Sequence, residues 1–260
     1  LGAQSFDDSV LRWMHRTHSA AQIVAAVGTL RDAGFEHLSL DLIFGLPAEL
    51  LRNWSQDLER AFLLEPEHIS LYGLTVESNT PLAHWAQRGQ AVAAPEDQYA
   101  AEFLAANQAL VAAGYEHYEV SNAARPGHRA RHNSAYWERR PYIGLGPSAH
   151  SGLGNERRWN LREWSGYQQA LLESRSPVAG QEILDGPAID LERLYLGLRT
   201  DRGVSKSRIA AQMLQQWAEA GWATCHSDRV RLTPEGWLRL DALVAAASIN
   251  SLHADVRAVE

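Results

Sequence analysis

Segments with helical periodicity alternate with short apolar runs along the first half of the chain. Apolar residues at helical spacing predict three helices, over 19–33, 53–65 and 95–114. Ser19 opens a capping-box pattern at the first helix, and Gly34 follows that helix where a glycine often ends one. These signals predict both ends of the first helix.

Short apolar runs lie between these helices. Residues 34–40, 66–71 and 114–120 share the letters E-H followed by alternating apolar residues, and each run predicts the entry to a strand. Residues 1–5 predict one more strand. Strands that alternate with helices indicate βα units, and therefore an α/β fold built on a parallel sheet.

The second half of the chain has a different pattern. Residues 124–165 show little periodicity and many Gly, Pro and Arg residues, so we expect long functional loops with short elements there. From Leu191 onward the pattern predicts a helix, a short helix capped by Ser205, a third helix, a hairpin turning at 227–228 and a final helix. This order is typical of a winged-helix-like domain.

Charge is unevenly distributed along the sequence. The formal net charge is −7, yet residues 124–162 hold eight arginines and two glutamates, a local charge of +6. A local field of this sign favours anionic ligands. Residues 186–260 carry nine basic and nine acidic residues, whereas a reader of the phosphate backbone should be distinctly basic. We therefore expect no nucleic-acid partner, and a pocket cover or partner surface instead.

Composition limits the other classes. A single cysteine, Cys225, excludes a disulfide framework and a thiolate-ligated iron–sulfur centre within this chain, and it favours a reducing, cytoplasmic compartment. No apolar run approaches the ~18 residues of a membrane helix. Residues 1–3 read like the middle of a buried strand, so we expect the N-terminal part to be missing; trimming by a few residues is the alternative.

Three polar residues accompany the first predicted strands. Asp41 lies within the apolar run 38–47, where a buried carboxylate is costly unless it is bonded. We expect Asp41 and Gln4 at strand ends that form a ligand mouth, as in parallel barrels. Hydrogen bonds to their own following turns are the alternative for both. Arg16 could reach over the same mouth or be a solvated helix charge.

The stretch 131–137, R-H-N-S-A-Y-W, combines a histidine with large aromatic residues inside the basic segment. His132 lies four residues from both His128 and Tyr136, and on a helix either pair would share a face. Imidazole suits zinc, iron or haem, while a surface histidine bonded to a loop is the alternative. The arginines of the segment could pair with the carboxylates of a flat ring. Three nearby aromatic side chains could pack on the face of that ring: Trp137, Tyr142 and Trp159.

Residues 144–151, G-L-G-P-S-A-H-S, formally fit the glycine fingerprint of dinucleotide sites. Pro147 and the glycines at 152 and 154 argue against the helix that this fingerprint requires. We therefore interpret the segment as a tight strand-end loop that presents His150.

Five motifs occur in order along nearly the whole chain: L-G-A-Q-S-F-D-D-x-V-L-x(4)-R, S-L-D-L-I-F-G-L-P, I-S-L-Y-G-L-T-V-E-x-N-T-P-L, H-N-S-A-Y-W and Y-I-G-L-G-P-S-A-H-S. Together they resemble the radical S-adenosylmethionine family of oxygen-independent coproporphyrinogen III dehydrogenases. The forms H-N-x-x-Y-W and G-P-x-A-H-S are similar to the HemW branch of that family, whose members are described as haem chaperones.

The resemblance implies a partial (β/α)₆ barrel of the TIM-like radical S-adenosylmethionine type, followed by a small C-terminal domain. It divides the chain into later barrel units over 1–123, a connecting region over 124–185, a winged-helix-like domain over 186–248 and a tail over 249–260. It also implies a three-cysteine loop upstream of Leu1 that binds a [4Fe–4S] cluster for cleavage of S-adenosylmethionine. By itself this chain is then not expected to be active.

The resemblance also assigns site residues. Gln4, Arg16 and Asp41 fall on positions that contact S-adenosylmethionine in the dehydrogenases. Thr75 and His150 match two further contact positions but differ in residue type, which puts a second S-adenosylmethionine molecule in doubt.

Two functions follow from the resemblance. The leading one is a haem chaperone that binds haem and delivers it to acceptor proteins, membrane-associated ones among them. His132 would then be the axial ligand of the iron, and Tyr136 and Arg131 would help to hold the tetrapyrrole. The alternative is oxidative decarboxylation of two propionates of coproporphyrinogen III to vinyl groups, which yields protoporphyrinogen IX.

Overall fold

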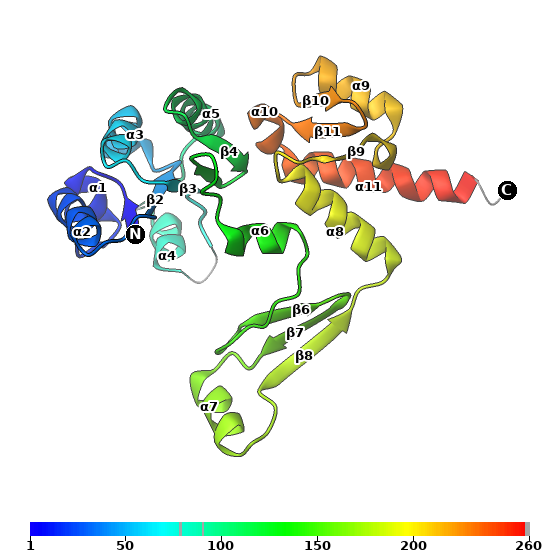
Figure 1. Ribbon diagram of the computed structural model, residues 1–260, viewed down its shortest axis with the longest axis horizontal. Coiled ribbons are helices and arrows are strands. Elements are labelled where there is room, and N and C mark those ends of the chain that lie inside the picture. The colour runs from blue at the N-terminus through cyan, green and yellow to red at the C-terminus, as the bar shows by residue number, and fades with distance from the viewer. Residues whose placement is uncertain (78–79, 90, 258–260) are drawn as a thin grey trace. The chain divides into compact units, whose positions relative to one another are not determined.

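The computed structural model describes residues 1–77, 80–89 and 91–257. The chain divides into two compact units, Leu1–Ala130 and Arg131–Glu260 (Figure 1). Ser78 and Asn79, which belong to the third motif, lie outside the described residues. Within the described part of the chain, no helix combines the length and the apolar character that crossing a membrane requires.

A five-stranded mixed sheet forms the centre of the first unit, in the order β1-β2-β3-β5-β4. Strands β1, β2 and β3 are parallel, whereas β5 runs antiparallel to both of its neighbours. The strands are β1 Gly2–Gln4, β2 Ser39–Phe44, β3 His68–Gly73, β4 Glu116–Glu119 and β5 Asn122–Ala124.

The expectation of a purely parallel sheet is therefore wrong at one edge. Strand β5 has only three residues, Asn-Ala-Ala, without a β-branched or aromatic side chain, and it follows β4 after a two-residue turn. Such a composition carries no strand signal of its own. The segment is a strand because it forms hydrogen bonds to β3 and β4. The other correction is smaller: β2 begins at Ser39, later than the run at 34–40 predicts.

The three helices that the periodicity predicts are confirmed as α2 Ala20–Asp32, α3 Trp54–Leu63 and α5 Glu96–Ala112. Ser19 and Gln22 form the capping box of α2. The side chain of Asn53 caps α3 by accepting the N–H of Gln56 at 3.1 Å. The first unit also holds α1 Asp8–Trp13, the 3₁₀ turn Ala48–Leu50 and α4 Pro81–Gln87.

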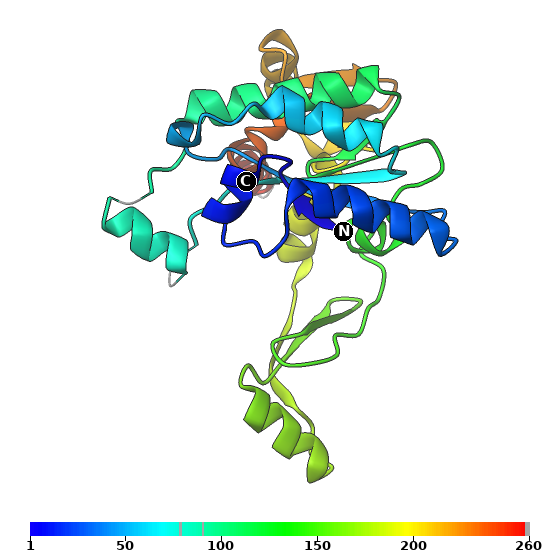
Figure 2. The same cartoon turned by 90° about the vertical axis from the view of Figure 1, so that its left-hand side faces the viewer.

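The two faces of the first sheet differ in character. On β2 the buried side chains of Leu40, Leu42 and Phe44 alternate with partly exposed ones. Helix α5 contacts β2 and β4, and α3 lies beside α5 over the same sheet, as both views show (Figures 1 and 2). The alternate positions of β2, which include Ser39 and Asp41, point to the opposite face, because successive side chains of a strand point to opposite sides.

The second unit begins with helix α6 Arg131–Trp137 and a three-stranded antiparallel sheet in the order β6-β7-β8. The short elements expected over 124–165 are present, and they include the regular strands β6 His150–Leu153 and β7 Glu156–Asn160. Their partner, β8 Val178–Ile183, lies beyond helix α7 Trp164–Leu172. These strands are largely exposed, so they lack the apolar alternation that marks a half-buried strand.

The remainder of the second unit follows the predicted order of elements. The predicted hairpin turn is confirmed between β10 and β11, and Ser205 caps the short helix. The final helix extends through residues for which a tail was expected. The elements are α8 Gly186–Leu198, β9 Val204–Ser205, the 3₁₀ turn Lys206–Arg208, α9 Ala211–Glu219, β10 Ala223–His226, β11 Arg229–Leu232, α10 Pro234–Trp237 and α11 Leu240–Arg257.

Candidate functional site

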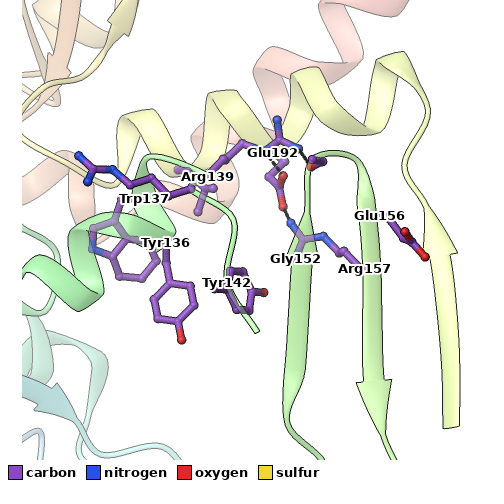
Figure 3. Close-up of a pocket in the computed structure, with 11 residues that line it drawn as sticks. Tyr136, Trp137, Arg139, Tyr142, Gly152, Glu156, Arg157 and Glu192 are labelled. Atoms are coloured by element: carbon purple, nitrogen blue, oxygen red, sulfur yellow. Dashed lines mark hydrogen bonds and ion pairs between the residues drawn. The ribbon is translucent and has the colours of Figure 1, made fainter. Parts of the chain in front are cut away.

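A cavity of about 240 Å³ opens in the second unit beside the C-terminal end of α6 (Figure 3). Its walls come from α6, the segment that follows it, the β6–β7 hairpin and one face of α8. The residues that line it are Tyr136, Trp137, Arg139, Arg140, Tyr142, Gly152, Gly154, Glu156, Arg157, Glu192 and Leu196. The motif 131–137 therefore contributes two aromatic walls to this cavity.

Two arginines meet one carboxylate at the cavity wall. Nε of Arg139 donates to Oε2 of Glu192, and Nη2 of Arg157 contacts Oε1 of the same carboxylate (Figure 3). The side chain of Arg139 is 17% exposed, that of Arg157 32% and that of Glu192 19%. Arg139 has a backbone φ of +53°, a left-handed conformation that is uncommon for a residue with a Cβ and that often occurs at functional sites.

A row of aromatic rings leads from α6 to the cavity. The rings of His132 and Tyr136 meet edge to face with centroids 4.9 Å apart, and Tyr136 meets Tyr142 in the same way at 4.7 Å. The ring of Tyr142 lies against Gly152, where a Cβ would stand 2.7 Å from Cε1 of the tyrosine. Glycine at 152 therefore lets this ring lie against the β6 backbone.

Trp137 lies at the end of α6 and completes one wall. The guanidinium carbon of Arg199 lies 4.4 Å from the centre of its ring, in a cation–π arrangement. The indole Nε1 of Trp137 is buried and donates to no protein group in the structure. A buried donor of this kind is costly, so it favours a site that water or a ligand completes.

The residues predicted to hold a tetrapyrrole divide into two groups. Tyr136 lines the cavity, whereas His132 and Arg131 are exposed on α6. The prediction that His132 and Tyr136 share a helix face is confirmed by their ring contact. The pairing of His132 with His128 on one helix is wrong, because α6 begins at Arg131 and His128 precedes it.

Two other predicted contributors lie elsewhere. The ring of His128 packs against His37 in the first unit, with centroids 4.9 Å apart. Trp159, which could pack on a flat ring, lies over Gly180 of β8, where any Cβ would overlap its indole. Its ring is 6.1 Å from that of His150, its partner across the β6–β7 pair.

The basic segment is partly neutralised by acids that pair with its arginines. Arg140 pairs with Glu138, Arg158 with Glu156, and Arg129 with Glu116. Glu138 and Glu156 lie within the segment and are already included in its charge of +6, whereas Glu116 and Glu192 lie outside it and reduce the total to +4. The local charge of +6 therefore overstates the field that a ligand would meet.

The polar face of the first sheet carries the residues predicted for S-adenosylmethionine. Gln4 ends β1, is 8% exposed and has a left-handed φ of +69°. Asp41 is the third residue of β2, level with Gly2 of β1 and Ser70 of β3. It lies within the sheet, which corrects the expectation of a strand end. The N–H of Gly45 in the following loop donates to Glu102 at 2.8 Å, so Asp41 does not satisfy that group.

The other three predicted contacts are exposed. Arg16 follows α1 in a turn, with its N–H donating to the carbonyl of Leu11 at 2.9 Å. Thr75 lies two residues after β3, and His150 begins β6 in the second unit. The expectation of a strand-end loop before His150 is thus reversed, because the loop leads into a strand rather than out of one.

A hydrogen-bonded chain on the polar face was not predicted. Ser39 Oγ lies 2.8 Å from Nδ1 of His68, and the other ring nitrogen lies 2.9 Å from the hydroxyl of Tyr118. Burial lowers the pKa of His68 to about 4, and Asp41 opposes this shift. Burial also raises the pKa of Tyr118 to about 12. His68 is therefore neutral at physiological pH. The E-H repeat contained this histidine but marks only a strand entry.

The side chains present differ in how well they fit each cofactor that the resemblance implies. The one cysteine, Cys225, is exposed on β10, so the chain cannot supply three thiolates to an iron–sulfur cluster. Among the described residues no group of three or more His, Cys, Asp or Glu side chains could hold a metal ion. A cavity of about 240 Å³ is below the roughly 300–1,000 Å³ of typical small-molecule sites, so it admits part of a tetrapyrrole and not the whole ring.

Comparison with known proteins gives close relatives over most of the chain. No family model matches the chain. The chain is 37% identical over 248 residues to the heme chaperone HemW of Mycobacterium tuberculosis, covering 94% of this chain and 63% of that protein. It is 32% identical over 249 residues to the heme chaperone HemW of Bacillus subtilis, covering 91% and 65%. The chain thus spans somewhat less than two thirds of these relatives.

A solved structure has the same fold. Coproporphyrinogen III oxidase (HemN) of Escherichia coli, a radical SAM enzyme, superposes with a TM-score of 0.72 at 21% identity, over 95% of this chain and 63% of that one. This likeness shows a shared α/β fold. The sequence relationship is more specific, since it extends through the motif 131–137 and the segment 142–151. The sequence therefore places the chain with the HemW proteins.

Proposed function

We propose that this chain is part of a haem chaperone that binds haem and delivers it to acceptor proteins. The observation that carries the proposal is the identity of 32–37% to HemW relatives over more than nine tenths of the chain. The acceptors would include membrane-associated proteins, and no nucleic acid would be bound.

We place the haem at α6, with His132 as the axial ligand of the iron and Tyr136 and Arg131 beside it. The exposure of His132 supports this role, because an axial ligand must reach the iron without a rearrangement of the core. The aromatic row from His132 to Tyr142 offers faces on which part of a porphyrin could pack.

A second group, S-adenosylmethionine, would contact Gln4, Arg16, Asp41, Thr75 and His150. The buried, left-handed Gln4 and the partly exposed Asp41 lie on adjacent strands, which supports a site on this face. The ligands of a [4Fe–4S] cluster would come from a part of the protein outside this chain.

The finer architecture belongs to the same proposal. Residues 1–123 would be the later units of a partial (β/α)₆ barrel, and 186–248 a winged-helix-like domain joined through 124–185. The parallel β1-β2-β3 order supports the first assignment, and the order of helices and hairpin supports the second. We propose a cytoplasmic location.

The alternative function is oxidative decarboxylation of coproporphyrinogen III. The shared fold with the HemN enzyme is compatible with it, but a fold by itself does not assign chemistry. Release of carbon dioxide from coproporphyrinogen III by the full-length protein under anaerobic conditions would favour the enzyme over the chaperone.

The direct test is an anaerobic haem titration of the full-length protein, followed in the Soret region. The wild type should give a saturable shift that His132→Ala loses, because the iron loses its imidazole ligand. His226→Gln is the matched control, since His226 is exposed on β10. Absence of saturable haem binding by the wild type would contradict the chaperone proposal. An unchanged spectrum in His132→Ala would remove His132 from the iron.

A further inference from the structure

Glu192 of α8 occupies a position that a ligand carboxylate would also fit. Arg139 and Arg157 come from different segments, the turn after α6 and strand β7, and their guanidinium groups converge on the two oxygens of this one carboxylate (Figure 3). Each guanidinium contacts a different oxygen through one nitrogen, and arginine donors suit carboxylates, so the two arginines together form a specific site for that group.

The charges of this cluster are unbalanced. Arg139 and Arg157 together carry two positive charges, and Glu192 supplies one negative charge. The other two charged residues of the lining have partners of their own, because Glu156 pairs with Arg158 and Arg140 with Glu138. The three-residue cluster therefore keeps a net charge of +1 and retains an attraction for an anion after Glu192 is bound.

The dimensions of the cavity favour a carboxylate arm as the ligand part. A volume of about 240 Å³ is small for a whole tetrapyrrole, whereas a short flexible side chain that ends in a carboxylate would fit. The walls next to the two arginines include Tyr136 and Tyr142, at the inner end of the aromatic row from His132. A flat ring at that row would thus direct its acidic side chains toward the arginines.

We propose that this cavity is a carboxylate-exchange site in which a propionate-type side chain of the ligand takes the place of Glu192 on Arg139 and Arg157. Glu192 is then an internal competitor that holds the site closed until a ligand carboxylate displaces it. The proposal rests on the haem function proposed above and adds the regulation of that site. It links ligand binding to the release of α8 from β7 and from the turn after α6, because the ligand carboxylate and Glu192 compete for the same two guanidinium groups.

The test compares haem with haem dimethyl ester, which keeps the ring and the iron but lacks free carboxylates. Both are titrated anaerobically into the full-length wild type and into Glu192→Gln, which keeps the size of the side chain and removes its charge. Because a competitor lowers apparent affinity by the fraction of protein that it blocks, Glu192→Gln should bind haem about tenfold more tightly. Its affinity for the ester should equal that of the wild type.

Substitutions of Arg157 should change the affinity for haem in the opposite direction. Arg157→Gln should bind haem about tenfold more weakly and leave the ester unaffected, because it removes one donor fork. Arg157→Lys should recover part of the haem affinity, since it keeps the charge but not the fork. Glu173→Gln is the matched control, because it breaks an exposed ion pair with Arg175 at the end of α7. It should leave the affinities for haem and for its ester unchanged.

The outcomes separate the two proposals. The exchange site would be overturned, while the haem function stands, if wild type and variants bound haem with equal affinity. The same holds if each substitution changed the affinity for haem and for its ester equally. Failure of the wild type to bind either compound would refute the haem function and the exchange site with it. Should Glu192→Gln not fold, as judged by circular dichroism, Glu192→Asp provides the second variant. Its shorter side chain cannot reach both arginines in the same way, and it should also bind haem more tightly.

Discussion

Nε2 of His68 on β3 lies 2.9 Å from the hydroxyl oxygen of Tyr118 on β4, a contact that passes across the short strand β5. The other ring nitrogen reaches Ser39 on β2, and the hydroxyl of Tyr118 accepts the N–H of Ala130 at 3.2 Å. This chain of polar groups joins strands β2, β3 and β4, together with the last residue of the first unit. It depends on a neutral imidazole that donates through one nitrogen and accepts through the other.

The stability of the protein should fall in mild acid because two buried histidines resist protonation. Burial lowers the pKa of both His68 and His117 to about 4, whereas an unfolded histidine has a pKa near 6.5. Between these values the unfolded state binds protons that the folded state excludes. The free energy of unfolding should therefore be constant above pH 6.5, decrease as the pH falls toward 4, and level off below 4.

Urea denaturation at pH 7.5 and pH 5.0 measures this effect. Each histidine can contribute up to about 1.4 kcal/mol for each pH unit within the window. His117→Gln should flatten the pH dependence, and the exposed His226→Gln should leave it unchanged. An identical slope in wild type and His117→Gln would contradict the assignment.

Asp57 should be essential for holding the segment that follows β1. Its two carboxylate oxygens accept the hydroxyl of Ser5 and the N–H of Phe6, each at 2.7 Å, and Arg52 lies 3.6 Å away. Asp57→Ala leaves these buried groups without their acceptor, so it should lower the free energy of unfolding by about 2–4 kcal/mol. The control is Glu59→Ala, at an exposed position of the same helix, and equal losses in the two variants would refute the role of Asp57.

Gly73 should be required because the ring of Tyr99 occupies the space where a side chain would begin. A Cβ at this position would overlap the hydroxyl of Tyr99. Gly73→Ala should destabilise the protein by about 1–3 kcal/mol, and the loss should be smaller in a Tyr99→Leu background. Gly28→Ala is the control of opposite sign, since nothing lies near its Cβ position in α2 and alanine favours a helix. Equal costs of Gly73→Ala in both backgrounds would exclude Tyr99 as the cause.

Asp41 should contribute to binding of S-adenosylmethionine by the full-length protein. Asp41→Asn removes a charge from the polar face of the sheet without changing the size of the side chain, and it should weaken binding about tenfold by loss of a charged hydrogen bond. Equilibrium dialysis against labelled S-adenosylmethionine measures the affinity, with Asp32→Asn at an exposed position of α2 as the control. Unaltered affinity in Asp41→Asn would remove this residue from the site.

The helices of the first unit were predictable because their signals are local. Ser19 and Asn53 cap neighbouring backbone groups, and Gly34 ends α2 with the positive φ that a glycine tolerates. The hairpin of β10 and β11 is equally local. The motif at 131–137 indicated the right part of the second unit, since two of its residues line the cavity.

Strand β5 and the β6–β7–β8 sheet were not predictable, because they are stabilised by partners distant in the chain rather than by their own residue pattern. The cavity was not predictable either, because its walls come from segments that are distant in the chain. The sequence by itself determined the helices, the basic segment and the aromatic motif, which depend on residue type and short-range spacing. Only the tertiary structure decided that Glu192, about fifty residues from Arg139, neutralises part of that segment, because ion pairing depends on distance in space.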